Sequence, residues 1–189
     1  MTKSLIVLIT LNLLVTCLFA QNVMINENVK EAYSNILSLR FDEAMKRIQA
    51  EKIINPTNVF IPYLENYIDF LKVTISEDEY LFDSIERKVS TRINEVKKLN
   101  DTSRFKNYFI GNINLQWATA NLKFGNYATG AIKINRAYRL LEENNREFPD
   151  FIPNSITLGV LHIMIGLVPD SYSWILDLIS IKGTVAQGQ

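Results

Sequence analysis

Two short stretches of this chain have the residues of a turn between two helices. The stretch Arg40-Phe41-Asp42-Glu43-Ala44 is followed twelve residues later by Pro56, and the stretch Phe124-Gly125-Asn126-Tyr127 is followed ten residues later by Ala137. A glycine or a large residue at the turn, with small residues in the helix that follows, is typical of two helices folded back on each other. Both stretches therefore predict an α-helical hairpin, and a single hairpin cannot bury its apolar face alone.

The remaining sequence predicts further helices, because apolar residues recur at helical spacing and only seven glycines and five prolines interrupt them. The expected pairs are residues 26–39 with 41–53, 60–76 with 79–99, 104–124 with 126–148, and 155–167 with 171–181. Ser76 and Glu79 have the spacing of a capping box at the start of the fourth helix. The sequence thus predicts an all-α fold of about four stacked antiparallel helical hairpins.

The N-terminal segment predicts export from the cell. Residues 1–20 contain Lys3, an apolar run from Leu5 to Phe19 and a small residue, Ala20, at the end, which is the organisation of a secretory signal peptide. An uncleaved membrane anchor and a lipoprotein modified at Cys17 are the alternatives for this segment. Cleavage after Ala20 would remove the only cysteine, so the remaining 169 residues (189 less 20) would form no disulfide.

The charge balance argues against a nucleic-acid partner. The chain has 20 basic and 20 acidic side chains, and loss of Lys3 with the signal leaves a net charge of −1 (19 less 20). Binding to nucleic acid needs a basic stripe that neutralises phosphates. We therefore expect no nucleic-acid partner.

No motif predicts a cofactor or a metal ion. Gly125 and Gly130 have the glycine spacing of a phosphate-binding loop, but Ala131-Ile132 stand where lysine and a hydroxyl residue would be needed. His162 is the only histidine and has no cysteine or carboxylate beside it in sequence, so it predicts a packed side chain rather than a metal ligand. The acidic run Glu77-Asp78-Glu79 lacks the pattern of a calcium loop and predicts a helix start.

The hairpin residues resemble tetratricopeptide repeats (TPR), in which small residues let paired helices approach and a large residue fills the turn. The matching positions are Ala32, Phe41, Ala44 and Pro56 in the first pair, and Ala118, Gly125, Tyr127, Gly130 and Ala137 in the third. The second and fourth pairs match only in helical period. The resemblance implies a TPR-like α-solenoid at residues 21–154, whose first helices line a groove that holds a protein or peptide.

The signal, the hairpins and the turn Phe148-Pro149-Asp150-Phe151 together are similar to exported repeat proteins of Gram-negative bacteria, especially Bacteroidota. This resemblance implies a location in the periplasm or cell envelope. It implies no reaction.

One candidate binding surface is a polar stripe on the helix 104–124. Asn112, Gln116, Thr119 and Lys123 lie at offsets of zero, four, seven and eleven, which places them on one face. Because the resemblance puts this helix in the groove, the stripe is a candidate peptide-binding surface.

The C-terminal region, residues 155–189, is the second candidate. From Ile156 to Ile181 the only charged side chains are Asp170 and Asp177, and a helix without a polar face must be covered by something. Trp174 is the residue expected to contact a protein partner, a second copy of the chain or a membrane surface. Alternatively, this region is the start of a missing part of a longer protein.

These observations predict a non-enzymatic protein–protein interaction scaffold of the cell envelope, with no catalytic residue. The first alternative is a membrane-associated helical protein that docks through its apolar C-terminal hairpin. The second is a hydrolase with dispersed carboxylates, since the separation of two acids is a property of the fold.

Overall fold

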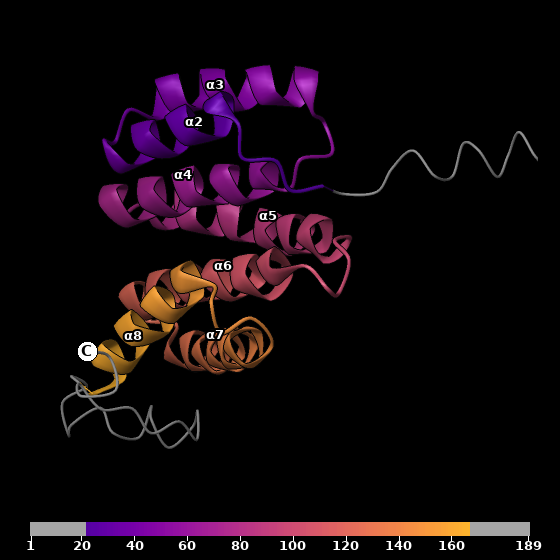
Figure 1. Ribbon diagram of the computed structural model, residues 1–189. Helices are drawn as coiled ribbons and strands as arrows, with labels where there is room; N and C mark the ends of the chain where they lie inside the picture. The colour runs from indigo at the N-terminus through magenta and orange to yellow at the C-terminus, as the bar shows by residue number, and fades with distance from the viewer. Residues whose placement is uncertain (1–21, 167–189) are drawn as a thin grey trace, which may run out of the picture.

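The computed structural model describes residues 22–166, and most of these residues are helical (Figure 1). The helices are α2 (Glu27–Leu37), α3 (Phe41–Ile54), α4 (Phe60–Ser76), α5 (Glu79–Lys97), α6 (Arg104–Lys123), α7 (Tyr127–Glu147) and α8 (Ile152–Gly166). Residues 22–166 contain no strand, only an isolated β-bridge between Asn22 and Asn58. The prediction of an all-α fold is therefore confirmed for residues 22–166.

Two of the predicted features lie outside the described residues. The first is the signal at residues 1–20. The second is the segment 167–189, with Trp174 and the predicted helix 171–181.

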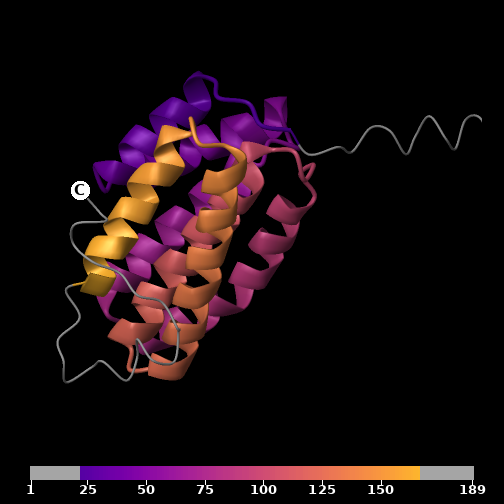
Figure 2. The same cartoon turned by 60° about the horizontal axis from the view of Figure 1, so that its bottom comes forward.

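The helices lie in successive layers along the molecule. The helices α2 and α3 lie at one end, α4 and α5 come next, and α6 and α7 follow, with α8 against α7 (Figures 1 and 2). Each helix contacts its neighbours in sequence, and α4 also contacts both α2 and α6. The first turns of α4 and α6 lie together, since the rings of Phe60 and Phe105 are 5.9 Å apart.

The helix α5 begins at Glu79 as predicted, but its capping residue differs from the predicted one. Ser76 is the last residue of α4, Glu77 has φ 55°, and Asp78 is the N-cap that accepts a hydrogen bond from the Leu81 backbone N–H at 3.1 Å. The capping box predicted at Ser76 is therefore wrong. The left-handed residue after α4 turns the chain, so Asp78 is the extended residue that stands before the first helical turn.

The start of α8 also differs, because α8 begins at Ile152 rather than at Ser155. Pro153 lies in the first turn of α8, where its missing N–H has no helical partner to lose. The predicted division between residues 21–154 and 155–189 therefore falls inside a helix.

Glycine lets α6 and α7 approach closely at two points. A Cβ added at Gly130 of α7 would lie 2.8 Å from Cδ2 of Leu122 and 3.3 Å from the carbonyl oxygen of Ala118. A Cβ added at Gly111 of α6 would lie 2.8 Å from Cγ of Leu141. The close approach expected at Gly130 is confirmed, and Gly111 is a second one that the sequence analysis did not single out.

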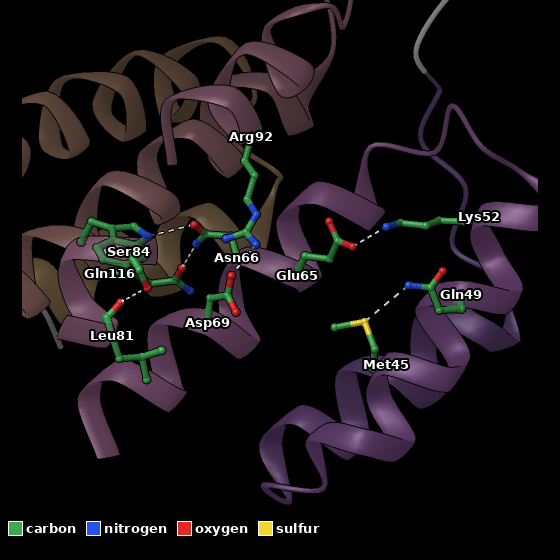
Figure 3. Close-up of polar contacts among 11 residues, drawn as sticks. Met45, Gln49, Lys52, Glu65, Asn66, Asp69, Leu81, Ser84, Arg92 and Gln116 are labelled. Atoms are coloured by element: carbon green, nitrogen blue, oxygen red, sulfur yellow. Dashed lines mark hydrogen bonds and ion pairs between the residues drawn. The ribbon is translucent and has the colours of Figure 1, made fainter. Parts of the chain in front are cut away.

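Polar side chains connect α4 to the helices on both sides of it (Figure 3). Lys52 of α3 pairs with Glu65, and Arg92 of α5 pairs with Asp69. The amide of Asn66 donates to Gln116 of α6 at 2.7 Å and accepts from the Trp117 indole N–H at 2.8 Å. Since buried polar groups need partners, these contacts fix how α4 and α6 align.

Candidate functional site

The predicted polar stripe lies on α6, and two of its members bind α4. Gln116 accepts the hydrogen bond from Asn66 of α4. The ammonium group of Lys123 donates to the Thr74 carbonyl oxygen of α4 at 2.8 Å and pairs with Glu77 at 2.7 Å. These two side chains therefore already have partners within the chain.

The other two members of the stripe bond to their own helix. Asn112 donates to the Tyr108 carbonyl oxygen at 2.9 Å, and Thr119 donates to the Leu115 carbonyl oxygen at 3.1 Å. Peptide binding by the stripe stays a prediction.

Between residues 22 and 166, no helix is both long and apolar enough to cross a bilayer. In the same range, no cluster of histidine, cysteine, aspartate or glutamate side chains is placed to hold a metal ion.

An aromatic pocket that the sequence analysis missed lies where the first turns of α2, α4 and α6 meet the start of α8. Its volume is about 290 Å³. The floor is formed by buried side chains, namely Val29, Tyr63, Phe109 and Phe151. Phe60, Phe105 and Tyr108 form partly buried walls. The rim is exposed and consists of Ile25, Lys30, Tyr33 and Pro153. We call this site the aromatic pocket.

Ring contacts between helices hold the walls of the aromatic pocket in place. Tyr63 stacks on Phe109 with centroids 4.3 Å apart, and Phe60 meets Phe109 edge-on at 4.9 Å. Phe105 meets Phe151 edge-on at 5.1 Å. Each such pair contributes about 0.5–1.5 kcal/mol beyond the area it buries. The pocket therefore exists before any ligand arrives.

Tyrosine hydroxyl groups supply the polar atoms of this region. Burial raises the pKa of Tyr63 well above its ordinary value, and the neighbouring hydroxyls of Tyr108, Tyr33 and Tyr67 raise it further. Burial likewise raises the pKa of Tyr108. These phenols stay protonated at neutral pH, so they can donate as well as accept hydrogen bonds.

Two cations border the aromatic pocket. Among the described residues, Lys30 is the only charged residue in its lining. The guanidinium of Arg104 lies 5.5 Å from the centre of the Phe105 ring and 5.2 Å from that of Phe151. Among residues 22–166, neither cation has a carboxylate within ion-pair distance, which is 4.0 Å. Arg104 is thus held against two rings while its charge stays unpaired.

The aromatic pocket could not be recognised from helical spacing. Helical spacing over residues 60–76 predicts only an apolar helix face, and the structure places Phe60 and Tyr67 of that face against the core. The sequence signal that could have indicated the pocket is a pair of aromatic residues, three or four positions apart, near the start of both α4 and α6. These residues are Phe60 and Tyr63 in α4, and Phe105 and Phe109 in α6.

A buried carboxylate lies at the junction of α2, α3 and α4. Glu51 is 2% exposed. Its oxygens accept hydrogen bonds from the amides of Asn26, Asn28, Asn55 and Asn58 at 2.7, 3.3, 3.0 and 2.7 Å. Burial raises the pKa of Glu51, but these amides together lower it more, so the pKa lies below its ordinary value. We call this group the Glu51 clamp.

The hydrolase alternative requires two carboxylates that face one another across a cleft. Glu51 is occupied by amide donors, and Asp69 is paired with Arg92. Both carboxylates therefore have structural partners, and the hydrolase alternative stays a hypothesis.

Comparison with known proteins gave no relative. No protein-family model, no curated protein and no solved structure matches this chain.

Proposed function

We propose that this protein is a non-enzymatic scaffold that holds a segment of another protein, and that its helices form a TPR-like stack of antiparallel hairpins. The loops within the pairs support the stack, because they are residues 38–40, 77–78 and 124–126. Loops this short join helices that lie side by side and run in opposite directions.

The observation that carries the proposed function is the aromatic pocket. Its volume of about 290 Å³ lies at the lower end of small-molecule pockets, which span roughly 300–1,000 Å³. One or two side chains of a peptide fit this space better than a large cofactor does. Aromatic residues are also the residue types that dominate binding energy where proteins meet.

Peptide selection tests this proposal. The complete chain is expressed and purified, and peptides that bind it are selected from a random library. The affinity of the selected peptides is then measured for the wild type and for the variant Tyr33→Ser. Tyr33 lies on the exposed rim, so its loss removes contact area without opening the core. We expect binding at least about tenfold weaker, which is the loss typical of an aromatic anchor.

Tyr80→Ser is the matched control, because Tyr80 of α5 is exposed and does not line the aromatic pocket. This variant should bind the selected peptides as the wild type does. Selected peptides that bind Tyr33→Ser and the wild type equally would contradict the proposal.

We propose that the scaffold works in the periplasm or cell envelope. Support comes from the signal-like residues 1–20. Protein recovered from the envelope fraction should begin at Gln21 when its N-terminus is sequenced. An N-terminus at Met1 would contradict cleavage.

One observation favours a second candidate function, docking of α8 on a membrane surface. Ile152, Ile156 and Val160 recur every four residues on α8 and are 67%, 62% and 49% exposed. In flotation with phosphatidylcholine–phosphatidylglycerol vesicles, Ile156→Asp and Trp174→Asp should each reduce retention. Ile132→Asp on α7, also at an exposed isoleucine, should not.

A further inference from the structure

We infer that the aromatic pocket binds a peptide segment in which an aromatic or aliphatic side chain stands next to acidic residues. The inference rests on the proposed function and adds the chemistry of the ligand to it. Three features of the site support it.

The first feature is the apolar interior of the aromatic pocket. Its floor and walls are apolar or aromatic, and Ile25 and Tyr33 leave further apolar surface exposed at the rim. A side chain that enters would remove this surface from water, and burial of apolar area is the main favourable term in association. The ligand therefore needs an apolar or aromatic side chain.

The second feature is the unpaired charge at the opening. Lys30 comes from α2 and Arg104 from the start of α6, so the two cations lie on different helices beside the aromatic pocket. The described part of the lining contains no carboxylate. Contact of Arg104 with two rings restricts its guanidinium before a ligand arrives, which lowers the entropy lost on binding. Acidic residues beside the apolar side chain would complement these cations.

The third feature is the direction of the helices. The lining residues lie in the first two turns of α2, α4 and α6, at the start of α8, or just before a helix begins. Helix N-termini carry partial positive charge from aligned peptide dipoles and favour nearby anions. The four helix N-termini around the aromatic pocket therefore strengthen the preference for an anionic ligand that Lys30 and Arg104 produce.

Another hollow of the molecule shows no such preference. The hollow along α7 is lined by Tyr138, Arg139, Glu142, Glu143 and Arg146. It carries both signs of charge and only one aromatic ring. A charged ligand would meet attraction and repulsion there, so the aromatic pocket is the better anionic-peptide site.

Three fluorescent decapeptides made otherwise of glycine and serine test the inference. Their binding to the protein expressed from the complete chain is measured by fluorescence anisotropy. The first carries phenylalanine between two pairs of aspartates. The second replaces the aspartates by lysines, and the third replaces the phenylalanine by serine. We expect the second to bind about tenfold more weakly than the first, since attraction becomes repulsion at two cations. The third should show no measurable binding.

Reversing the charge of the site should reverse the preference. The double variant Lys30→Glu, Arg104→Glu is expected to bind the lysine peptide more tightly than the aspartate peptide. Lys88→Glu with Lys97→Glu is the matched control, because both lysines are exposed on α5, and it should keep the wild-type order. Circular dichroism confirms that each variant is folded.

The outcomes separate the inference from the proposed function. One outcome is that the aspartate and lysine peptides bind the wild type equally and that neither binds Tyr33→Ser. This outcome would overturn the charge preference but not the proposed scaffold function. An unchanged order in the double charge variant would also overturn the inference. If neither the decapeptides nor any library peptide binds in a way that depends on Tyr33, both proposals fall.

Discussion

The pair α2 and α3 and the pair α6 and α7 are held together by different physical means. The helices α6 and α7 approach at Gly111 and Gly130, where no space is left for a Cβ. The helices α2 and α3 pack through Ala32 and Ala44, both fully buried, and a buried carboxylate, Glu51, ties their ends together.

One helical architecture therefore depends on shape in one pair of helices and on charge in the other. A larger side chain in place of the glycine disrupts a close contact between helices, and such a contact contains no ionisable group. A carboxylate surrounded by amide donors fails when its charge is lost, because the donors are then left without acceptors. The two pairs should therefore respond to different perturbations.

The largest expected effect comes from removing the charge and the acceptors of the Glu51 clamp. Glu51→Leu has similar size but leaves four amides, one of them the buried Asn58, without this acceptor. We expect the free energy of unfolding to fall by about 3 kcal/mol, as for lost hydrogen bonds to a buried charged group. Urea denaturation followed by circular dichroism measures it.

Glu43→Leu is the control for this variant. Glu43 lies on the same helix but is exposed and only pairs with Lys46 at 3.7 Å, so the change should be within about 0.5 kcal/mol. Equal losses at positions 43 and 51 would show that the clamp does not hold α2 and α3 together.

A smaller loss is expected from adding volume to the glycine contact. Gly130→Leu places a large side chain against Leu122 and the Ala118 carbonyl oxygen, and overpacking of this kind costs about 1–3 kcal/mol. Thr129→Leu, at the exposed neighbouring position, is the control and should melt close to the wild type. An unchanged melting temperature for Gly130→Leu would refute a rigid close approach.

Alanine at each of the two glycines tests how rigid each contact is. A Cβ at Gly111 meets Leu141, which is 0% exposed, whereas a Cβ at Gly130 meets the partly buried Leu122. Alanine gains about 1 kcal/mol of helix propensity over glycine at both positions. Because Leu122 is less enclosed than Leu141, we expect Gly130→Ala to be roughly 1 kcal/mol more stable than Gly111→Ala. The reverse order in thermal unfolding would contradict this reading of the two contacts.

Much of the fold was predictable because helical spacing is a local property of sequence. The helices from α2 to α7 lie close to their predicted ranges, and the small residue Gly130 correctly indicated a close crossing. The errors fell at helix ends. Asp78 rather than Ser76 caps α5, and α8 begins at Ile152 rather than at Ser155.

The aromatic pocket was not predictable, because it depends on which helices meet. Phe105 and Phe151 are 46 residues apart (151 less 105), yet their rings are 5.1 Å apart. Helical spacing shows that such rings lie on an apolar face, and it does not show whether that face is filled or left open. The Glu51 clamp was missed for the same reason, since Asn26 and Asn58 join it from different layers.

The pH dependence of stability separates the charged contact at Glu51 from the glycine contact most directly, and its effect is the smallest of those predicted. Folding lowers the pKa of Glu51 below its ordinary value of 4.5, through amide hydrogen bonds that outweigh burial. A lowered pKa contributes stability above the ordinary value, and this contribution is lost as pH falls through the folded value. The stability gap between wild type and Glu51→Gln, which keeps one amide oxygen, should therefore be widest at pH 7 and narrow below 4.5.

Urea denaturation at a series of pH values from 7 to 3 measures this gap, and Gly130→Leu provides the reference. Other carboxylates, such as Glu77 with its pKa lowered by Lys123, titrate in all three proteins and cancel from the differences. The gap between wild type and Gly130→Leu should stay constant, because that contact holds no ionisable group. If the Glu51→Gln gap stays constant as well, the clamp acts through packing, and the contrast between the two helix pairs is lost.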